Sequence, residues 1–240
     1  MVLAQARVEL ALTLRRGESV LLTLGIPVLL LVFFSVVDVL PLPEGTEDAI
    51  DFLAPGILAL AVLSTAMVSL GIATGFERQY GVLKRLGTTP LGRRALLTAK
   101  TLAILVVEAI QVVVLSAVAV ALGWRPEGNP LLALAAALLA TVAFAGLGLL
   151  MAGTLRGEVT LATANGLYLV LLLLGGMVFT LDRLPGPLRS FAELLPAAAL
   201  STALDGALSA SASVPGKAWA VLLAWAVAAP ALAAATFRWE

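Results

Sequence analysis

The fold is decided by stretches such as residues 130–153, which read PLLALAAALLATVAFAGLGLLMAG and contain no charged residue. At 1.5 Å per residue, about 20 residues of helix cross the ~30 Å hydrocarbon layer of a bilayer. Five further apolar stretches occupy residues 18–37, 52–74, 98–122, 159–181 and 217–236. Their apolar residues are continuous and do not alternate with polar ones, which favours helices over barrel strands. We therefore expect an all-α integral membrane protein with six transmembrane helices, forming a single transmembrane domain over residues 1–240.

The composition agrees with lipid as the main solvent. The chain is 61% hydrophobic and 12% charged, whereas soluble domains carry about 25% charged residues. It contains no Cys and no His, which excludes disulfides, thiolate chemistry, the usual zinc sites and histidine acid–base catalysis. The net charge is zero, so nothing indicates a nucleic-acid partner.

The basic residues predict the orientation. With the N-terminus inside, the inner segments hold eleven Lys and Arg residues and the outer segments four. The inner ones are Arg7, Arg15, Arg16, Arg78, Lys84, Arg85, Arg93, Arg94, Lys100, Arg156 and Arg238. The positive-inside rule therefore predicts that both termini are cytoplasmic.

Two segments outside the spans are predicted to form short helices. Residues 1–16 place Leu3, Leu10 and Leu14 at near-helical spacing, so we expect an interfacial elbow helix. Residues 182–216 are apolar but interrupted by prolines, and each piece is too short to span. We expect two short re-entrant or interfacial helices there, in the outer leaflet, with a turn at Pro196.

The longest inner loop predicts a cytoplasmic helix over residues 76–87. Four apolar residues fall at steps of four and three, and charged residues cover most of the remaining surface. The apolar set is Phe76, Tyr80, Leu83 and Leu86, and the charged set is Glu77, Arg78, Lys84 and Arg85. Such an amphipathic helix suits docking of a cytoplasmic partner, or else attachment to anionic lipid.

Polar residues inside the spans are the remaining candidate sites. Glu108 lies about midway through the third stretch, with Gln111 one turn further on. A carboxylate at this depth costs about 3 kcal/mol, so it should face protein or water, or be protonated. Asn165 and Tyr168 share one face of the fifth stretch. These four residues are candidates for a substrate path, and bonding between helices is the alternative reading.

Common catalytic and nucleotide-binding motifs are absent from the sequence. There is no G-x-x-x-x-G-K-[ST] motif, so the chain should not bind ATP by itself. There is also no Gly-x-Ser-x-Gly motif. We expect a protein that is not an enzyme and that has no cofactor of its own.

The whole pattern resembles the membrane subunit of an ABC exporter of the ABC-2 type. Six spans, an N-terminal elbow and the absence of an ATPase motif match that family. The loop from Phe76 to Leu86, followed by Thr89-Pro90-Leu91, is similar to the family's stretch around its coupling helix. Leu194-Leu195-Pro196 resembles the family's short extracellular helices.

The resemblance implies a function and partners. Two permease copies, identical or paralogous, would pair with cytoplasmic ABC ATPase subunits that bind ATP and Mg²⁺. The complex would export a hydrophobic or amphiphilic substrate, such as a drug, an antibiotic or a lipid, across a bacterial inner membrane. Multidrug resistance is one such role. The alternatives are an ion-coupled secondary transporter using Glu108 and a non-transporting membrane scaffold.

Overall fold

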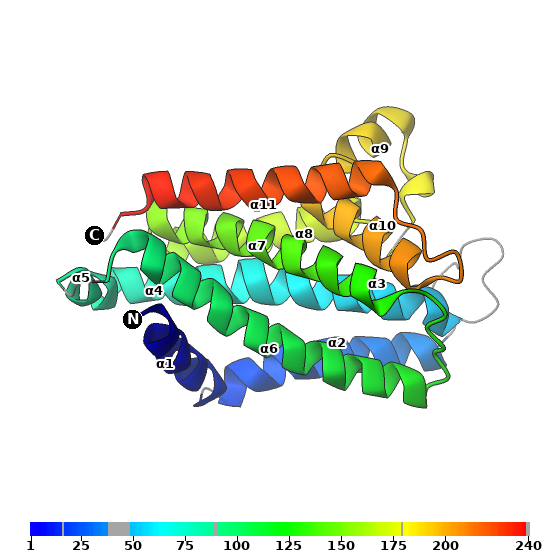
Figure 1. Cartoon of the computed structure of the whole chain (residues 1–240), viewed down its shortest axis with the longest axis horizontal. Helices are drawn as coiled ribbons and strands as arrows, with labels where there is room; N and C mark the ends of the chain where they lie inside the picture. Colours follow the sequence, from blue (N-terminus) through cyan, green and yellow to red (C-terminus); the bar gives the residue numbers. More distant parts are fainter. Residues whose placement is uncertain (16, 38–48, 89–90, 179, 239–240) are drawn as a thin grey trace.

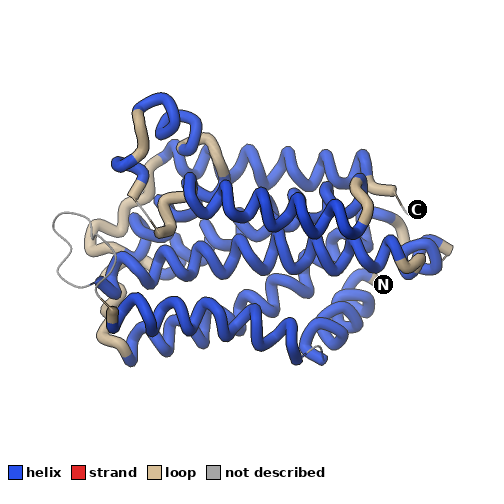
Figure 2. Tube along the Cα trace, turned by 180° about the vertical axis from the view of Figure 1, so that it is seen from behind, coloured by secondary structure: helices blue, strands red, loops and turns tan. Residues whose placement is uncertain are grey.

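The computed structural model describes residues 1–15, 17–37, 49–88, 91–178 and 180–238. Every regular element in these ranges is a helix (Figure 2). Arg16, which counts among the inner basic residues, and the Thr89-Pro90 pair of the family resemblance lie outside the described residues. The helices are α1 Val2–Arg15, α2 Gly17–Val36, α3 Ala49–Leu63, η1 Ser64–Ser69, α4 Leu70–Gln79, α5 Val82–Gly87, α6 Arg93–Ala121, α7 Pro130–Thr154, α8 Gly157–Leu174, η2 Leu181–Arg183, α9 Gly186–Ala192, α10 Pro196–Leu208 and α11 Gly216–Thr236.

A helix occupies each of the six predicted positions. In the described ranges, five are long and apolar enough to cross a membrane: Ala49–Gln79, α6, α7, α8 and α11. The helix at the first position, α2, carries a shorter apolar segment over Thr23–Val36. Helices α9 and α10 are together long and apolar enough to cross a membrane, but the pair is bent by 84° at the break between them.

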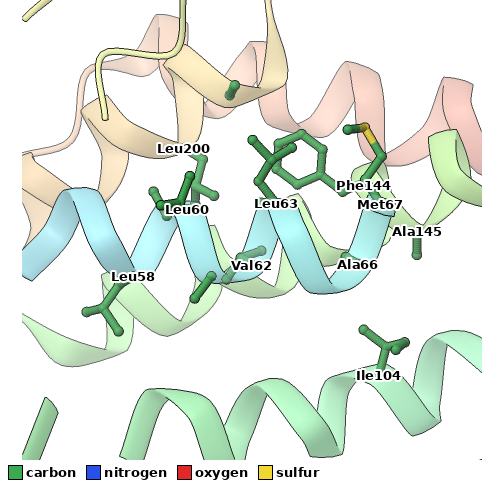
Figure 3. Close-up of a cluster of buried hydrophobic side chains, with 14 of the residues drawn as sticks. Leu58, Leu60, Val62, Leu63, Ala66, Met67, Ile104, Phe144, Ala145 and Leu200 are labelled. Atoms are coloured by element: carbon green, nitrogen blue, oxygen red, sulfur yellow. The ribbon is translucent and has the colours of Figure 1, made fainter. Parts of the chain in front are cut away.

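The second crossing forms the centre of the bundle. Helices α3 and α4 are joined through η1, a turn of π-helix, into one continuous helix over Ala49–Gln79. Nearly every residue of α3 from Ile50 onward is buried. Leu63 and Met67 face Phe144 of α7, and Leu60 lies beside Leu200 of α10 (Figure 3). Apolar residues on all sides of α3 fit its central position.

Glycines permit close packing between the central helices. Gly71 of α4 lies against Gly148 of α7, where an added Cβ would come within 3.1 Å of the Gly148 backbone. One turn further, Gly75 lies against Thr160 of α8. Two helices that meet at small residues can gain van der Waals contact in a solvent that offers no hydrophobic driving force.

The two ends of the bundle differ in what they carry. Both chain termini and α5 lie at one end, which we call the terminal end, and α9 projects at the opposite end (Figure 1). Helix α1 packs along α6 at the terminal end. This agrees with the predicted grouping of both termini with the 76–87 segment on one side.

The segment before the last helix has the predicted broken form. Helix α9 is exposed along most of its length, whereas α10 is buried against α3, α7 and α11. The break comes just before Pro196, which begins α10. Proline suits the first turn of a helix, because the amide it lacks would have no partner there.

Two predicted boundaries were wrong. The fifth apolar stretch was expected to stay helical to residue 181, but α8 ends at Leu174. Gly176 follows with φ +70°, a left-handed conformation that ends helices readily at glycine. The expected continuous helix over residues 76–87 is also interrupted. The transmembrane helix itself continues to Gln79, and α5 starts anew at Val82.

Candidate functional site

Residues 76–87, which we call the coupling segment, consist of the end of α4, a sharp turn and the short helix α5. Gly81 adopts φ +73°, and its left-handed backbone separates α4 from α5. A side chain is disfavoured in this conformation, so Gly81 allows the chain to reverse tightly. Because of the turn, the four apolar residues of the expected stripe do not share one helical face.

Exposure confirms that the stripe is divided. Tyr80 is 73% exposed, whereas Leu83 is fully buried at 0%. Phe76 is partly buried and stacks on Tyr80 with ring centroids 6.0 Å apart. Leu86 is partly buried, and Lys84 and Arg85 are exposed. The segment therefore presents one aromatic and two basic side chains outward while Leu83 anchors α5 to the bundle.

Arg78 points into the bundle instead of toward a partner. Its guanidinium donates hydrogen bonds to the carbonyl oxygens of Ala152 (2.9 Å) and Leu155 (3.1 Å). These carbonyls lie at the C-terminal end of α7, where the last turn of a helix leaves carbonyl groups without intrahelical donors. A cation there is also favoured by the helix dipole. Arg78 therefore ties the coupling segment to α7.

Glu77 belongs to an ion triad around a buried lysine. The ammonium of Lys100, which is 2% exposed, lies 2.6 Å from a carboxylate oxygen of Glu77 and 2.9 Å from one of Glu9. Gln5 donates a further hydrogen bond to Glu9 at 2.9 Å. The triad joins α4, α6 and α1, so it connects the coupling segment to the N-terminal helix through one lysine.

Glu108 lies deep in the bundle with half of its carboxyl group engaged. The side chain is 5% exposed, and the hydroxyl of Thr141 on α7 donates to its Oε2. Its Oε1 has no hydrogen-bond partner among the described residues. A buried acceptor without a partner is costly, so this oxygen marks a place where a proton, water or polar ligand would be stabilised.

Gln111 connects three elements in the bundle interior. Its amide donates to the backbone oxygen of Thr23 on α2 at 2.7 Å, and it accepts from the hydroxyl of Thr65 at 2.9 Å. Thr65 lies in η1, and π-helical turns of this kind occur often at functional sites. Glu108 and Gln111 therefore form a polar centre along one face of α6.

Asn165 and Tyr168 are separate from this centre. Asn165 is exposed and donates back to the carbonyl of Leu161 on its own helix at 2.9 Å. Tyr168 is partly buried. Neither side chain bonds to Glu108 or Gln111 within the described structure, so the four predicted path residues fall into two groups.

The comparison with known proteins identifies the family. The family model described as ABC-2 type transporter matches residues 2–208. The chain belongs to the ABC-2 type transporter family. No curated protein matches the chain. Membership makes it a multi-pass membrane permease that is not itself catalytic, in a family that pairs with an ABC ATPase component.

Several polar residues that bond between helices in this ABC-2 permease were not predicted from the sequence. Lys100 was counted with the inner loop, but it lies about two turns into α6. Its position just inside an apolar stretch was a signal that it needs a partner. Thr65 and Thr141 gave no such signal, because a threonine hydroxyl inside a span can bond to the backbone of its own helix, and Glu9 lies outside the apolar stretches.

Proposed function

We propose that this ABC-2 permease is the membrane subunit of an ATP-driven exporter for hydrophobic or amphiphilic compounds. The observation that carries the proposal is the division of the coupling segment into an anchored face and an exposed face. Glu77 and Arg78 are bonded to other helices, and Tyr80 and Arg85 point away from the bundle. A partner that pushes on the exposed face would therefore move α1, α6 and α7 together.

The partner in this proposal is a cytoplasmic ABC ATPase that binds ATP and Mg²⁺. The excess of basic residues at the terminal end supports a cytoplasmic location for that end. An exposed tyrosine flanked by basic side chains is a suitable anchor for a protein interface, where aromatic and arginine residues dominate the binding energy.

A second permease copy completes the proposed exporter. Helix α8 exposes Asn165 on a surface that includes Gly166, whose added Cβ would meet no atom of this chain within 4 Å. A side-chain amide is better satisfied against a neighbouring helix than against lipid, and small residues let helices approach. Both features support contact between two copies along α8. The apolar bundle and short connections suit lipophilic cargo.

The proposal is tested by reconstituting the permease with a candidate ABC ATPase from the same organism. In Tyr80→Ala, we expect transport to fall at least about tenfold while ATP hydrolysis by the complex continues, because the ATPase would lose its main contact with the exposed face of the coupling segment. Tyr80 is exposed, so the variant should fold. The matched control is Phe191→Ala, which removes an exposed aromatic from α9 at the opposite end. Unchanged transport by well-folded Tyr80→Ala would contradict the docking role.

A second function is favoured by one observation, the unpartnered oxygen of Glu108. We propose as the alternative an ion-coupled transporter in which this carboxyl carries a proton. In that case transport would proceed without any ATPase, would follow the proton gradient, and would be abolished in Glu108→Gln. Copurification with an ATPase but no substrate movement under either driving force would instead indicate a membrane scaffold.

A further inference from the structure

Two neighbouring hollows lie between α6 and α11 in the terminal half of the bundle, with α7 as their floor, and we call the pair the lateral groove. Its first stretch has a volume of about 410 Å³ and is lined by Arg94 and Thr101 of α6 and by the second half of α7 from Val142 to Leu149, with small residues of α11 opposite. The second stretch, of about 490 Å³, lies beside the first at the terminal end and is lined by Arg93, Thr154 and Arg238 among other residues.

The hollow follows from small residues where the helices meet. Gly146 of α7 packs against Pro230 of α11, and the groove wall on α11 is formed mainly by alanines. Alanine side chains leave the space between helices that larger residues would fill. The result is an apolar groove on the side of the bundle, and in a membrane this side faces lipid.

The length of the groove matches one leaflet. From Val142, at the middle of α7, to Thr154, at its end, the helix rises about 18 Å. Half of the hydrocarbon layer is about 15 Å thick. An acyl chain lying in the apolar stretch would therefore place its headgroup beside Arg93, Arg94 and Arg238.

The arginines at this end are available for an anion. In the part of the chain that the structure describes, the guanidinium groups of Arg93, Arg94 and Arg238 have no acidic partner within ion-pair distance. None of the residues that line either stretch of the groove is acidic. Arg78 is bonded nearby to the end of α7, and the backbone amide of Arg238 donates to Gly153 at 3.2 Å. Positive charge is therefore concentrated where the groove ends.

We propose that this groove is a binding site for one anionic phospholipid, with the phosphate held by Arg93, Arg94 and Arg238 and an acyl chain in the apolar stretch. Guanidinium groups bind phosphate through paired hydrogen bonds and are the preferred residues for this purpose. The site is separate from the coupling segment and from Glu108, so it stands independently of the proposed transport function.

The test uses the purified permease in detergent and native mass spectrometry. The protein is offered dioleoyl phosphatidylglycerol and dioleoyl phosphatidylcholine in equal amounts, and we expect preferential retention of phosphatidylglycerol. The triple variant Arg93→Gln/Arg94→Gln/Arg238→Gln should weaken this retention by about fivefold per arginine removed, or on the order of 100-fold in total.

The control variant Arg7→Gln/Arg15→Gln/Arg156→Gln removes the same charge from exposed arginines outside the groove. It should retain phosphatidylglycerol like the unmodified permease. Equal loss in both triple variants would show nonspecific attraction by bulk charge and would overturn the site, as would full retention in the groove variant.

A second pair of variants tests the acyl-chain half of the site. Ala231→Phe fills the apolar stretch and should weaken retention at least about fivefold, whereas Ala228→Phe, on the same helix outside the groove, should not. Competition by soluble glycerol phosphate at micromolar concentration, with Ala231→Phe unaffected, would show that a free phosphate group is the ligand and would contradict the lipid assignment.

Discussion

The ion triad of Lys100, Glu77 and Glu9 allows a quantitative test of how the coupling segment is held. In Lys100→Met, the two carboxylates lose their shared cation. Each has an oxygen within 3 Å of the lysine nitrogen, so those oxygens lie within about 6 Å of each other. At an effective dielectric constant of about 20, two unit charges at this distance repel by about 3 kcal/mol.

Loss of the lysine should therefore be strongly destabilising. Removal of one partner from a buried ion pair typically costs 3–5 kcal/mol, and the lower figure applies here because both carboxylates keep some solvent contact. We expect Lys100→Met to reduce the free energy of unfolding, measured by titration with denaturing detergent in mixed micelles, by about 3 kcal/mol. The triple variant Lys100→Met/Glu77→Gln/Glu9→Gln should recover most of this loss, since no unpaired charge remains.

The matched control is Lys217→Met. Lys217 makes an ion pair of similar geometry with Glu193, at 2.5 Å, but is 56% exposed. Exposed pairs contribute about 0–1 kcal/mol, so this variant should remain within about 1 kcal/mol of the unmodified permease. A loss below about 1 kcal/mol in Lys100→Met, or a triple variant no more stable than the single one, would refute the description of the triad as a coupled unit.

Two further predictions concern packing and pH. Gly148→Ala should lower the free energy of unfolding by about 1–3 kcal/mol, because the new Cβ would lie 2.5 Å from the Met67 carbonyl oxygen. The control Gly25→Ala on α2, whose new Cβ would meet only a Leu21 side-chain carbon at 4.0 Å, should be neutral or slightly stabilising in the same titration. Hydrogen bonds from Lys217 and then Arg189 lower the pKa of Glu193 below its ordinary value. The ionised link between α9 and α11 therefore contributes its full stability above the unfolded pKa of about 4.3. That stability is lost as the pH falls through the lower pKa of the folded state. Spin labels on α9 and α11 should report a constant separation from pH 7 to pH 5 and an increase only in stronger acid, and an increase at pH 6 would contradict the assignment.

Helix positions were predictable from the sequence because lipid imposes a simple constraint. Backbone groups in a bilayer must bond within their own helix, so long apolar runs such as residues 130–153 leave few alternatives. The helix α7 covers Pro130–Thr154 and agrees closely with that stretch. The broken helices before α11 were also predictable, because prolines divide an apolar segment into pieces too short to span.

The coupling segment shows where pattern alone was insufficient. Spacing placed Phe76, Tyr80, Leu83 and Leu86 on one face, but that argument assumed an unbroken helix. Gly81 took a left-handed conformation, and the pieces on either side then packed differently. The spacing of apolar residues does not indicate which glycine will adopt a left-handed conformation and end a helix, since glycine is also tolerated within helices.

The sequence by itself determined that this chain is a membrane protein, at which positions its helices lie and which of its segments are polar, because hydropathy and helix length depend on residues close together in the chain. Tertiary structure alone decided which polar groups meet. Lys100 finds Glu9 and Glu77 across distances of 91 and 23 residues, and Gln111 finds Thr65 and Thr23. These partners are fixed by the rotation and depth of each packed helix, and those depend on side-chain contacts among helices that are distant in the chain.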